Sequence, residues 1–221
     1  MDFTAIDFET ATSKFTSACS LGWCVVEDNK IVEREEILIR PEPFEFTKYN
    51  VRIHGIKPEM VEDKPTFDVY WDVIQDRIEN RTVIAHNASF DVRVLCSTLK
   101  YYGIELPSFK YMCTVKLSQK AYPELESHKL NKLCSALGIR FHHHHAYDDA
   151  YACAMAFLRM AEDYSLMSSG EMEECFDAPC GVIYPGIDLA AKVGKSAKRK
   201  KTKTKLAANL LTSCYFWRHS L

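Results

Sequence analysis

The chain has 221 residues, of which 47% are hydrophobic, so it is long enough to bury one core of ordinary size. Its net charge of −2 hides an asymmetry. Residues 192–221 carry nine of the 28 Lys and Arg side chains and no Asp or Glu, which leaves residues 1–191 at −11. An acidic body argues against a passive nucleic-acid binder, which presents a basic face, unless metal ions offset the repulsion.

The cysteines and the apolar runs of the sequence indicate the cellular compartment. The nine cysteines are odd in number and form no CxxC pair, which argues against a disulfide framework or a zinc knuckle and indicates reduced, buried thiols. No charged apolar leader opens the chain, and no run approaches 18 apolar residues. We therefore expect a soluble, cytoplasmic protein that has no membrane partner.

The first half of the chain predicts strands followed by an α/β unit. Residues 4–10, 19–27 and 31–40 are β-rich, and the short turn at 28–30 predicts an antiparallel meander. Helical spacing covers 66–78, with Thr66 as a plausible N-cap. A short apolar strand at 82–86 then leads through a tight turn into a helix that ends near Gly103.

The second half predicts helices and then a change of composition. Helices are expected at 113–120, at 129–137 and from about residue 150 to 164. We expect one domain over 1–165, a linker or draped loop over 166–191, and a disordered basic tail over 192–221. The tail either tethers nucleic acid electrostatically or is a solvated terminus with no specific role.

Two acids stand out on the first predicted strand. Asp7 and Glu9 are two residues apart, so they project side by side from the face opposite Ile6 and Phe8. Burying two like charges this close costs several kcal/mol, on the order of the cost of an unpaired buried ion. The pair therefore indicates either a bound cation or a strand that ends at a solvated edge.

Two more acids and a histidine complete a candidate site. Asp91 follows the strand at 82–86, where clefts in α/β sheets lie, although a favourable helix-dipole interaction also explains a lone Asp there. Asp149 opens the last helix, five residues after His144. Carboxylates can hold two Mg²⁺ or Mn²⁺ ions on a phosphodiester, and a histidine can serve as the base that activates water.

Three stretches carry a resemblance to a known family: Asp7-Phe8-Glu9-Thr10, residues 86–91 (HNASFD) and residues 144–150 (HHAYDDA). They resemble the motifs of the DEDDh, or DnaQ-like, 3′–5′ exonucleases, the family of the proofreading epsilon subunit of bacterial DNA polymerase III. The resemblance covers residues 1 to about 163. It implies a ribonuclease-H-like α/β fold in which helices flank a mixed five-stranded sheet, and stepwise release of 5′-mononucleotides from a 3′ end.

The resemblance also implies roles for individual residues. The metal carboxylates, which would hold two Mg²⁺ or Mn²⁺ ions, are Asp7, Glu9, Asp91 and Asp149, and His144 is the general base. The implied substrate-binding residues are Phe8, Thr10, His86, Asn87 and Phe90. Phe8 and Phe90 are better explained as core residues than as platforms on which bases stack.

Four consecutive histidines, residues 142–145, require a choice of register. The family pattern His-x-Ala-x-x-Asp-Ala fits from His144 and fails from His143. We therefore expect His143 to be a solvated loop residue, and a nickel- or zinc-binding role for the cluster would be adventitious.

Three functions remain open at this point. A DNA 3′–5′ exonuclease is favoured, and an RNA or oligoribonucleotide exonuclease similar to RNase T and oligoribonuclease shares the same motifs. A catalytically dead nucleic-acid or partner-binding module is a third reading, although a binding module has no need of four repelling carboxylates. The implied partner is a nucleic acid with a free 3′ end, and a DNA polymerase enters only by analogy.

Overall fold

A computed structural model describes residues 1–143 and 145–187 of the chain. The chain divides into a compact unit, Met1–Pro185, and a second unit, Gly186–Leu221, of which only residues 186 and 187 are described. The predicted base His144 and the predicted basic tail over 192–221 therefore lie outside the described residues.

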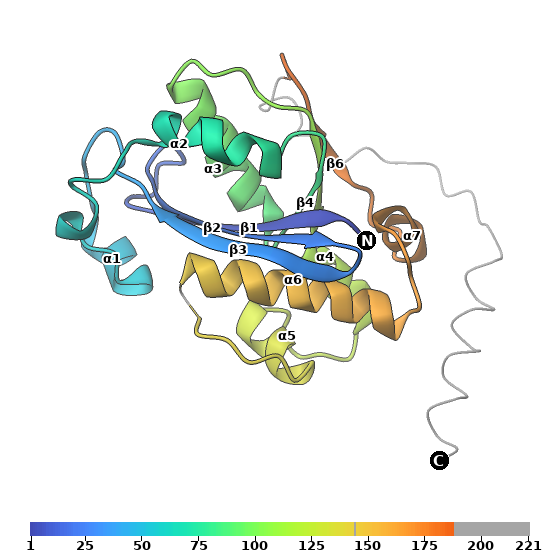
Figure 1. Ribbon diagram of the computed structural model, residues 1–221. Helices are drawn as coiled ribbons and strands as arrows, with labels where there is room; N and C mark the ends of the chain where they lie inside the picture. Colours follow the sequence, from blue (N-terminus) through green and yellow to red (C-terminus); the bar gives the residue numbers. More distant parts are fainter. Residues whose placement is uncertain (144, 188–221) are drawn as a thin grey trace, which may run out of the picture. The chain divides into compact units, whose positions relative to one another are not determined.

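The first unit is built on a mixed sheet of six strands in the order β3-β2-β1-β4-β5-β6 (Figure 1). Strand β1 pairs antiparallel with β2 and parallel with β4, which places it at the centre of the sheet. Strand β5 is parallel to β4 and antiparallel to β6. The strands are β1 (Phe3–Thr10), β2 (Ala18–Glu27), β3 (Lys30–Leu38), β4 (Thr82–Ala85), β5 (Phe109–Cys113) and β6 (Gly181–Ile183).

Helices cover both faces of the sheet. Figure 1 shows α2 and α3 on one face, and α6, with α5 outside it, on the other. The helices are α1 (Lys48–His54), α2 (Phe67–Ile74), α3 (Ala88–Tyr101), α4 (Thr114–Ala121), α5 (Leu130–Ala136), α6 (Ala146–Asp163) and α7 (Ser169–Cys175). Two 3₁₀ turns, η1 (Pro58–Met60) and η2 (Gln75–Arg77), flank α2 in the chain.

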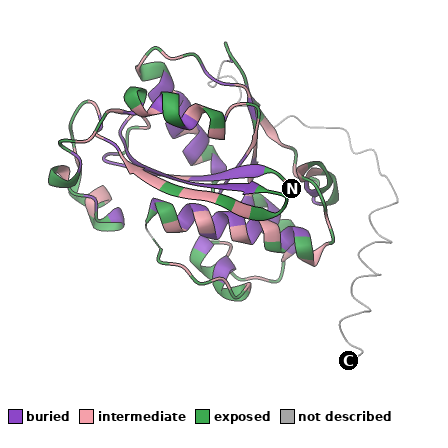
Figure 2. Ribbon diagram, viewed as in Figure 1, coloured by how far each residue is buried: buried purple, intermediate pink, exposed green. Residues whose placement is uncertain are grey.

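The alternation of β1 separates the two halves of the core. Phe3 packs against Phe157 of α6, with ring centroids 4.9 Å apart, and Phe8 packs against Phe67 of α2 at 6.1 Å. Side chains at odd-numbered positions of β1 therefore face α6, and those at even-numbered positions face α2 and α3. Figure 2 shows the resulting buried stripe along β1 and the inner side of α6.

The predicted meander is confirmed. Asp28 and Asn29 join β2 to β3 with φ values of 50° and 62°. Positive φ at both central residues is typical of the type I′ turn, whose twist matches that of the flanking strands.

The α/β class is confirmed, but the sheet has six strands rather than the expected five. Strand β6 pairs with β5, and Gly181 allows this because a Cβ there would lie 2.0 Å from the Tyr111 ring. Met172 and Phe176 join the core beneath α6. The expectation of a linker or draped loop over 166–191 is thus corrected for its described part, because α7 and β6 pack into the first unit.

Among the described helices, none is both long enough and apolar enough to span a bilayer.

Candidate active site

Three carboxylates meet between β1 and α6. Asp7 and Glu9 occupy odd-numbered positions near the carboxyl end of β1, so they face α6, and Asp149 lies in the first turn of that helix. One carboxylate oxygen from each of the three lies within 4.8 Å of the others. The structure therefore brings three of the four predicted metal carboxylates to a common point.

A glycine opposite Asp7 lets α6 approach the sheet this closely. Gly22 of β2 is the cross-strand partner of Asp7. A Cβ at Gly22 would lie 2.1 Å from the Ala146 carbonyl oxygen and 2.6 Å from the Tyr147 nitrogen, both in the first turn of α6. Gly22 was not among the predicted site residues, although an isolated glycine within a strand signals close backbone approach.

The fourth carboxylate is buried beside the first strand. Asp91 lies in the first turn of α3, is 1% exposed, and accepts a hydrogen bond of 3.0 Å from the Phe8 backbone N–H. This bond ties the start of α3 to the segment between Asp7 and Glu9. Asp91 is not one of the three residues whose oxygens lie within 4.8 Å of one another, but its charge acts on both Asp7 and Glu9.

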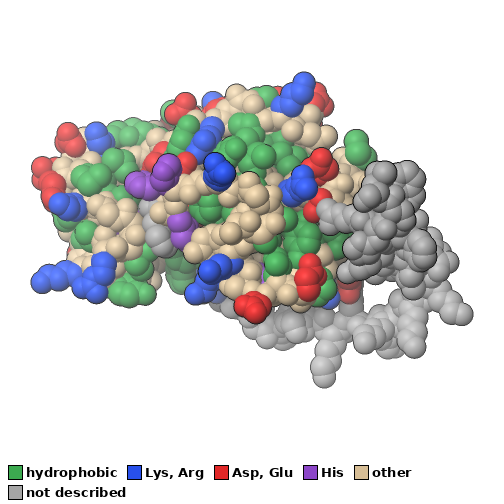
Figure 3. Space-filling view, turned by 90° about the horizontal axis from the view of Figure 1, so that it is seen from below, with side chains coloured by type: hydrophobic (Ala, Val, Ile, Leu, Met, Phe, Trp, Pro, Cys, Tyr) green, Lys and Arg blue, Asp and Glu red, His purple; other side chains and the backbone are tan. Residues whose placement is uncertain are grey.

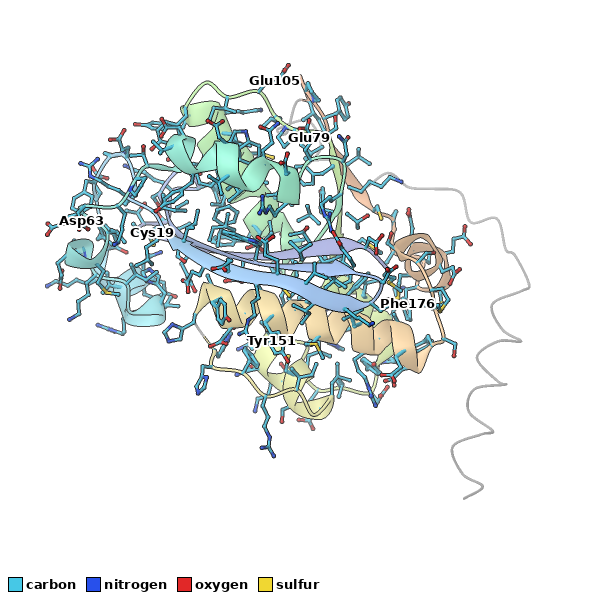
Figure 4. All side chains as sticks on the ribbon, viewed as in Figure 1. Cys19, Asp63, Glu79, Glu105, Tyr151 and Phe176 are labelled. Atoms are coloured by element: carbon cyan, nitrogen blue, oxygen red, sulfur yellow. The ribbon has the colours of Figure 1, made fainter. Side chains whose placement is uncertain are left out.

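An arginine on β3 holds the first turn of α6. The Arg34 guanidinium carbon lies 3.7 Å from the ring centre of Tyr147 and 4.2 Å from that of Tyr151, which Figure 4 labels on α6. Arg34 also forms an ion pair with Asp148, the residue before Asp149. Sequence reasoning offered no signal for Arg34, because the contact joins residues more than a hundred positions apart.

Burial and mutual repulsion raise the pKa values of these acids. Burial, followed by the charges of Asp91 and Asp149, raises the pKa of Asp7 well above its ordinary value. Burial and then the charge of Asp149 raise the pKa of Glu9 to about 8. Burial raises the pKa of Asp91 to about 7, even though backbone hydrogen bonds act in the opposite direction.

The chemistry of this cluster fits divalent metal ions. Its donors are carboxylate oxygens, which hard cations such as Mg²⁺ and Mn²⁺ prefer. The charges that act on Asp7 and Glu9 are all negative, so a cation would relieve repulsion from every one of them. A solvated edge, the alternative explanation for the acid pair, disagrees with the burial of Asp91 and Asp149 at 1% and 4% exposure.

One histidine near the site contacts an acid. His143 is exposed in the loop before α6, as expected, but its Nδ1 lies 2.9 Å from Asp149 Oδ1. The pattern of the sequence favoured His144, which the structure does not describe. His86 lies 2.9 Å from the Thr114 hydroxyl, and burial lowers its pKa to about 4, so its imidazole is neutral near pH 7.

The predicted substrate-binding residues fall into buried and accessible positions. The side chain of Phe8 is buried against Phe67, and Thr10 is also buried, so neither offers a side-chain surface for a base. Asn87 is exposed in the left-handed conformation before α3. Phe90 is half-buried, with its ring 6.1 Å from that of Phe15.

Comparison with known proteins identifies the family of this chain. A family model described as "Exonuclease" matches residues 4–157, which is more than half of the chain and includes all four carboxylates. The chain belongs to the DnaQ-like exonuclease family. The prediction of a nuclease of this family is therefore confirmed.

Relatives of this exonuclease chain include much larger proteins. It is 32% identical over 164 residues to DNA polymerase III PolC-type of Thermotoga petrophila and 31% identical over 169 residues to that of Bacillus subtilis. These matches cover 72% and 73% of the chain but only 12% and 11% of the relatives, so the chain spans about an eighth of their length.

Solved structures confirm the ribonuclease-H-like fold. Exonuclease X, solved with a 5′ overhanging duplex DNA, has a TM-score of 0.63 and 26% identity over 78% of this chain and 98% of that one. The nuclease domain of 3′hExo, a DEDDh family member bound to rAMP, has a TM-score of 0.61. At 17% identity, over 73% of this chain and 92% of that one, the second likeness concerns the fold alone.

Proposed function

We propose that this chain is a metal-dependent 3′–5′ exonuclease that releases 5′-mononucleotides from DNA. The observation that carries the proposal is the meeting of Asp7, Glu9 and Asp149 oxygens within 4.8 Å in a chain of the exonuclease family. These three residues, together with Asp91, would hold two Mg²⁺ or Mn²⁺ ions. When bound, the ions supply charge stabilisation for the phosphodiester and a more acidic water.

Other groups of the chain hold the proposed metal-binding carboxylates in place. The Phe8 backbone N–H fixes the Asp91 carboxylate, so this ligand is oriented before substrate arrives. Arg34 and Gly22 fix the first turn of α6 and with it the Asp149 carboxylate. Such preorganised positioning is worth several kcal/mol, on the order of the effect of orienting reacting groups.

A histidine in the loop before α6 accepts the proton of the attacking water. Water adds to phosphorus, and the bond from phosphorus to the 3′-oxygen of the upstream nucleotide breaks. The departing 3′-oxygen takes a proton from solvent to become a hydroxyl, and the phosphate stays on the 5′-oxygen of the released nucleotide. We assign the base to His144 on the sequence pattern. His143 is the second candidate, because its Nδ1 lies 2.9 Å from Asp149 Oδ1.

DNA is the proposed substrate because, among the relatives described above, those most similar in sequence to this chain are linked to DNA. Exonuclease X was solved with DNA, and the PolC-type relatives are DNA polymerases by name. RNA would use the same carboxylates, and discrimination would rest on contacts to the 2′-hydroxyl. By analogy with PolC, a DNA polymerase is the proposed protein partner, and coelution with such a polymerase from a sizing column would support it.

An oligonucleotide time course tests the proposed reaction. We expect a 5′-labelled DNA to shorten one nucleotide at a time with Mg²⁺, and the reaction to stop with EDTA. Asp7→Asn should lower kcat by about a hundredfold or more, since several kcal/mol of metal-dependent charge stabilisation is lost. Asp72→Asn, an exposed acid on α2, is the matched control.

Two results would overturn parts of this proposal. Undiminished hydrolysis by the Asp7→Asn variant would end the metal-carboxylate mechanism. Faster digestion of an RNA of the same sequence than of the DNA would end the assignment of DNA as substrate.

A further inference from the structure

A short helix is hydrogen-bonded to the backbone that follows the acidic pair of β1. Asn50 of α1 donates from Nδ2 to the Thr10 carbonyl at 2.8 Å and to the Thr12 carbonyl at 3.2 Å. His54, at the other end of α1, lies with Nε2 3.2 Å from the same Thr10 carbonyl. Because Thr10 directly follows Glu9, these bonds fix α1 next to the end of β1 that carries the carboxylates.

The outer face of α1 is basic and aromatic. Lys48, Tyr49 and Arg52 are all exposed, Tyr49 at 70%, and their spacing of three and four residues puts them on one face of the helix. The sequence from residue 46 to residue 58 contains no Asp or Glu. At the end of the molecule at which Figure 1 places α1, Figure 3 shows Lys and Arg side chains together with Asp and Glu side chains.

Some basic side chains of the first unit are already held by acids. Lys14, Arg40 and Arg77 each form an ion pair with a glutamate. Among the residues that the structure describes, neither Lys48 nor Arg52 has an acidic partner within 4.0 Å. Their charge is therefore available to a ligand, in a body whose net charge over residues 1–191 is −11.

We infer that Lys48, Tyr49 and Arg52 form a binding track for the nucleic-acid strand upstream of the terminal nucleotide. The inference rests on the proposed function, which puts the 3′ terminus at Asp7 and Glu9. Cations offset the repulsion between phosphates and the acidic body, and an exposed aromatic ring stacks on bases of any sequence. The track therefore binds the strand without sequence preference.

The length of α1 sets the reach of the track. Seven residues of helix span about 10 Å, which corresponds to about three phosphates at the per-strand spacing of about 3.4 Å in duplex DNA. The track contributes nothing to a substrate that ends at the scissile phosphate, and it contributes fully to a strand of four or more nucleotides.

Two substrates separate the track from the reaction centre. One is the p-nitrophenyl ester of thymidine 5′-monophosphate, and the other is a 5′-labelled DNA 15-mer. For K48E/R52E we expect KM for the 15-mer to rise at least tenfold at low salt with kcat unchanged, while hydrolysis of the ester stays at the wild-type rate. The slope of log KM against log salt should become shallower by about 1.4, because each phosphate contact to a single strand contributes about 0.7.

A charge-matched control uses two lysines at the opposite end of the sheet. Lys30 opens β3, beside the end of β2 that pairs with the start of β1, and Lys100 lies in the last turn of α3. K30E/K100E changes the net charge equally, so it should leave KM for the 15-mer within about twofold of the wild type. Tyr49→Ala should raise that KM about tenfold, and Tyr49→Phe should retain it, since the ring is what stacks.

The outcomes distinguish this inference from the proposed function. A wild-type protein that cleaves neither substrate refutes the proposed function. A wild-type protein that cleaves both, beside a K48E/R52E variant with unchanged KM for the 15-mer, refutes the track. Equal losses on the ester and the 15-mer refute the track as well, because they place the effect at the reaction centre.

Discussion

Gly22→Ala is the sharpest test of how the fold builds its site. The added Cβ would lie 2.1 Å from the Ala146 carbonyl oxygen and 2.2 Å from its carbon, whereas ordinary contacts begin at 3.4 Å. Both obstacles are backbone atoms, so no side-chain rotation relieves the clash. The first turn of α6 must withdraw by about 1 Å, and it carries Asp149 with it.

The magnitude follows from this displacement. Overpacking costs about 1–3 kcal/mol of folding stability, which lowers Tm by about 5 °C in a unit of this size. A misplacement of about 1 Å can cost about a hundredfold in rate. We therefore expect kcat on a DNA oligonucleotide to fall about a hundredfold at saturating Mg²⁺, well beyond what the loss of folded protein explains at 25 °C.

The matched control is Gly170→Ala, where a Cβ would meet only the Ser168 hydroxyl oxygen at 3.8 Å. This variant should keep both kcat and Tm close to the wild-type values. Wild-type kcat in a folded Gly22→Ala protein would refute the argument that the close approach of β2 and α6 positions Asp149.

Two further predictions concern the charge and the anchoring of the site. Burial raises the pKa of Glu9 to about 8 and of Asp91 to about 7, so the metal-free folded state binds more protons than the unfolded chain, and its stability should fall as pH rises from about 5 to 8. The Tm in EDTA should therefore be lower at pH 8 than at pH 5, with Mg²⁺ restoring it at pH 8, and a Tm that rises over this range in EDTA would contradict the argument. Arg34→Ala should weaken Mg²⁺ activation about tenfold, and Arg34→Lys should not rescue it, because an ammonium cannot stack on Tyr147 while it pairs with Asp148. Full rescue by lysine in a Mg²⁺ titration of activity would show that charge alone is needed.

The parts of the fold that the sequence predicted carry strong local signals. The alternation through residues 4–10 identified the strand and both of its faces, and residues 28–30 identified the turn of the hairpin. The same alternation placed Asp7 and Glu9 side by side. These features depend on neighbours in the chain, so local patterns are sufficient to find them.

Other elements needed information from distant parts of the chain. Strand β5 has the mixed pattern FKYMC and is fixed by pairing with β4 and β6. Helix α1 has seven residues and is secured by Asn50 and His54, which bond to backbone carbonyls some 40 positions earlier. Strand β6 has three residues and exists only because β5 offers it an edge. Periodicity within a short window contains none of these contacts.

The site shows the same division. The sequence identified the four acids, but it gave no indication of what holds Asp149 in place, because Gly22 and Arg34 lie on other strands. It also favoured His144 as the base on a spacing pattern, which stays a prediction because His144 lies outside the described residues, and the structure describes His143 beside Asp149. Spacing along the chain constrains which residues can serve, but the side chain that reaches a carboxylate is set by the path of the loop.

These observations link the stability of the chain to its proposed chemistry. The carboxylates of Asp7, Glu9 and Asp91 are buried or half-buried, and burial and mutual repulsion raise their pKa values. Without a cation this arrangement costs folding free energy that replacement by neutral side chains would recover. The acids cannot separate to relieve this repulsion, because Gly22 allows α6 to lie close to the sheet and the Phe8 N–H holds Asp91. A divalent ion removes the cost by binding the folded state alone, so metal binding and folding of this site should be measured as one linked equilibrium.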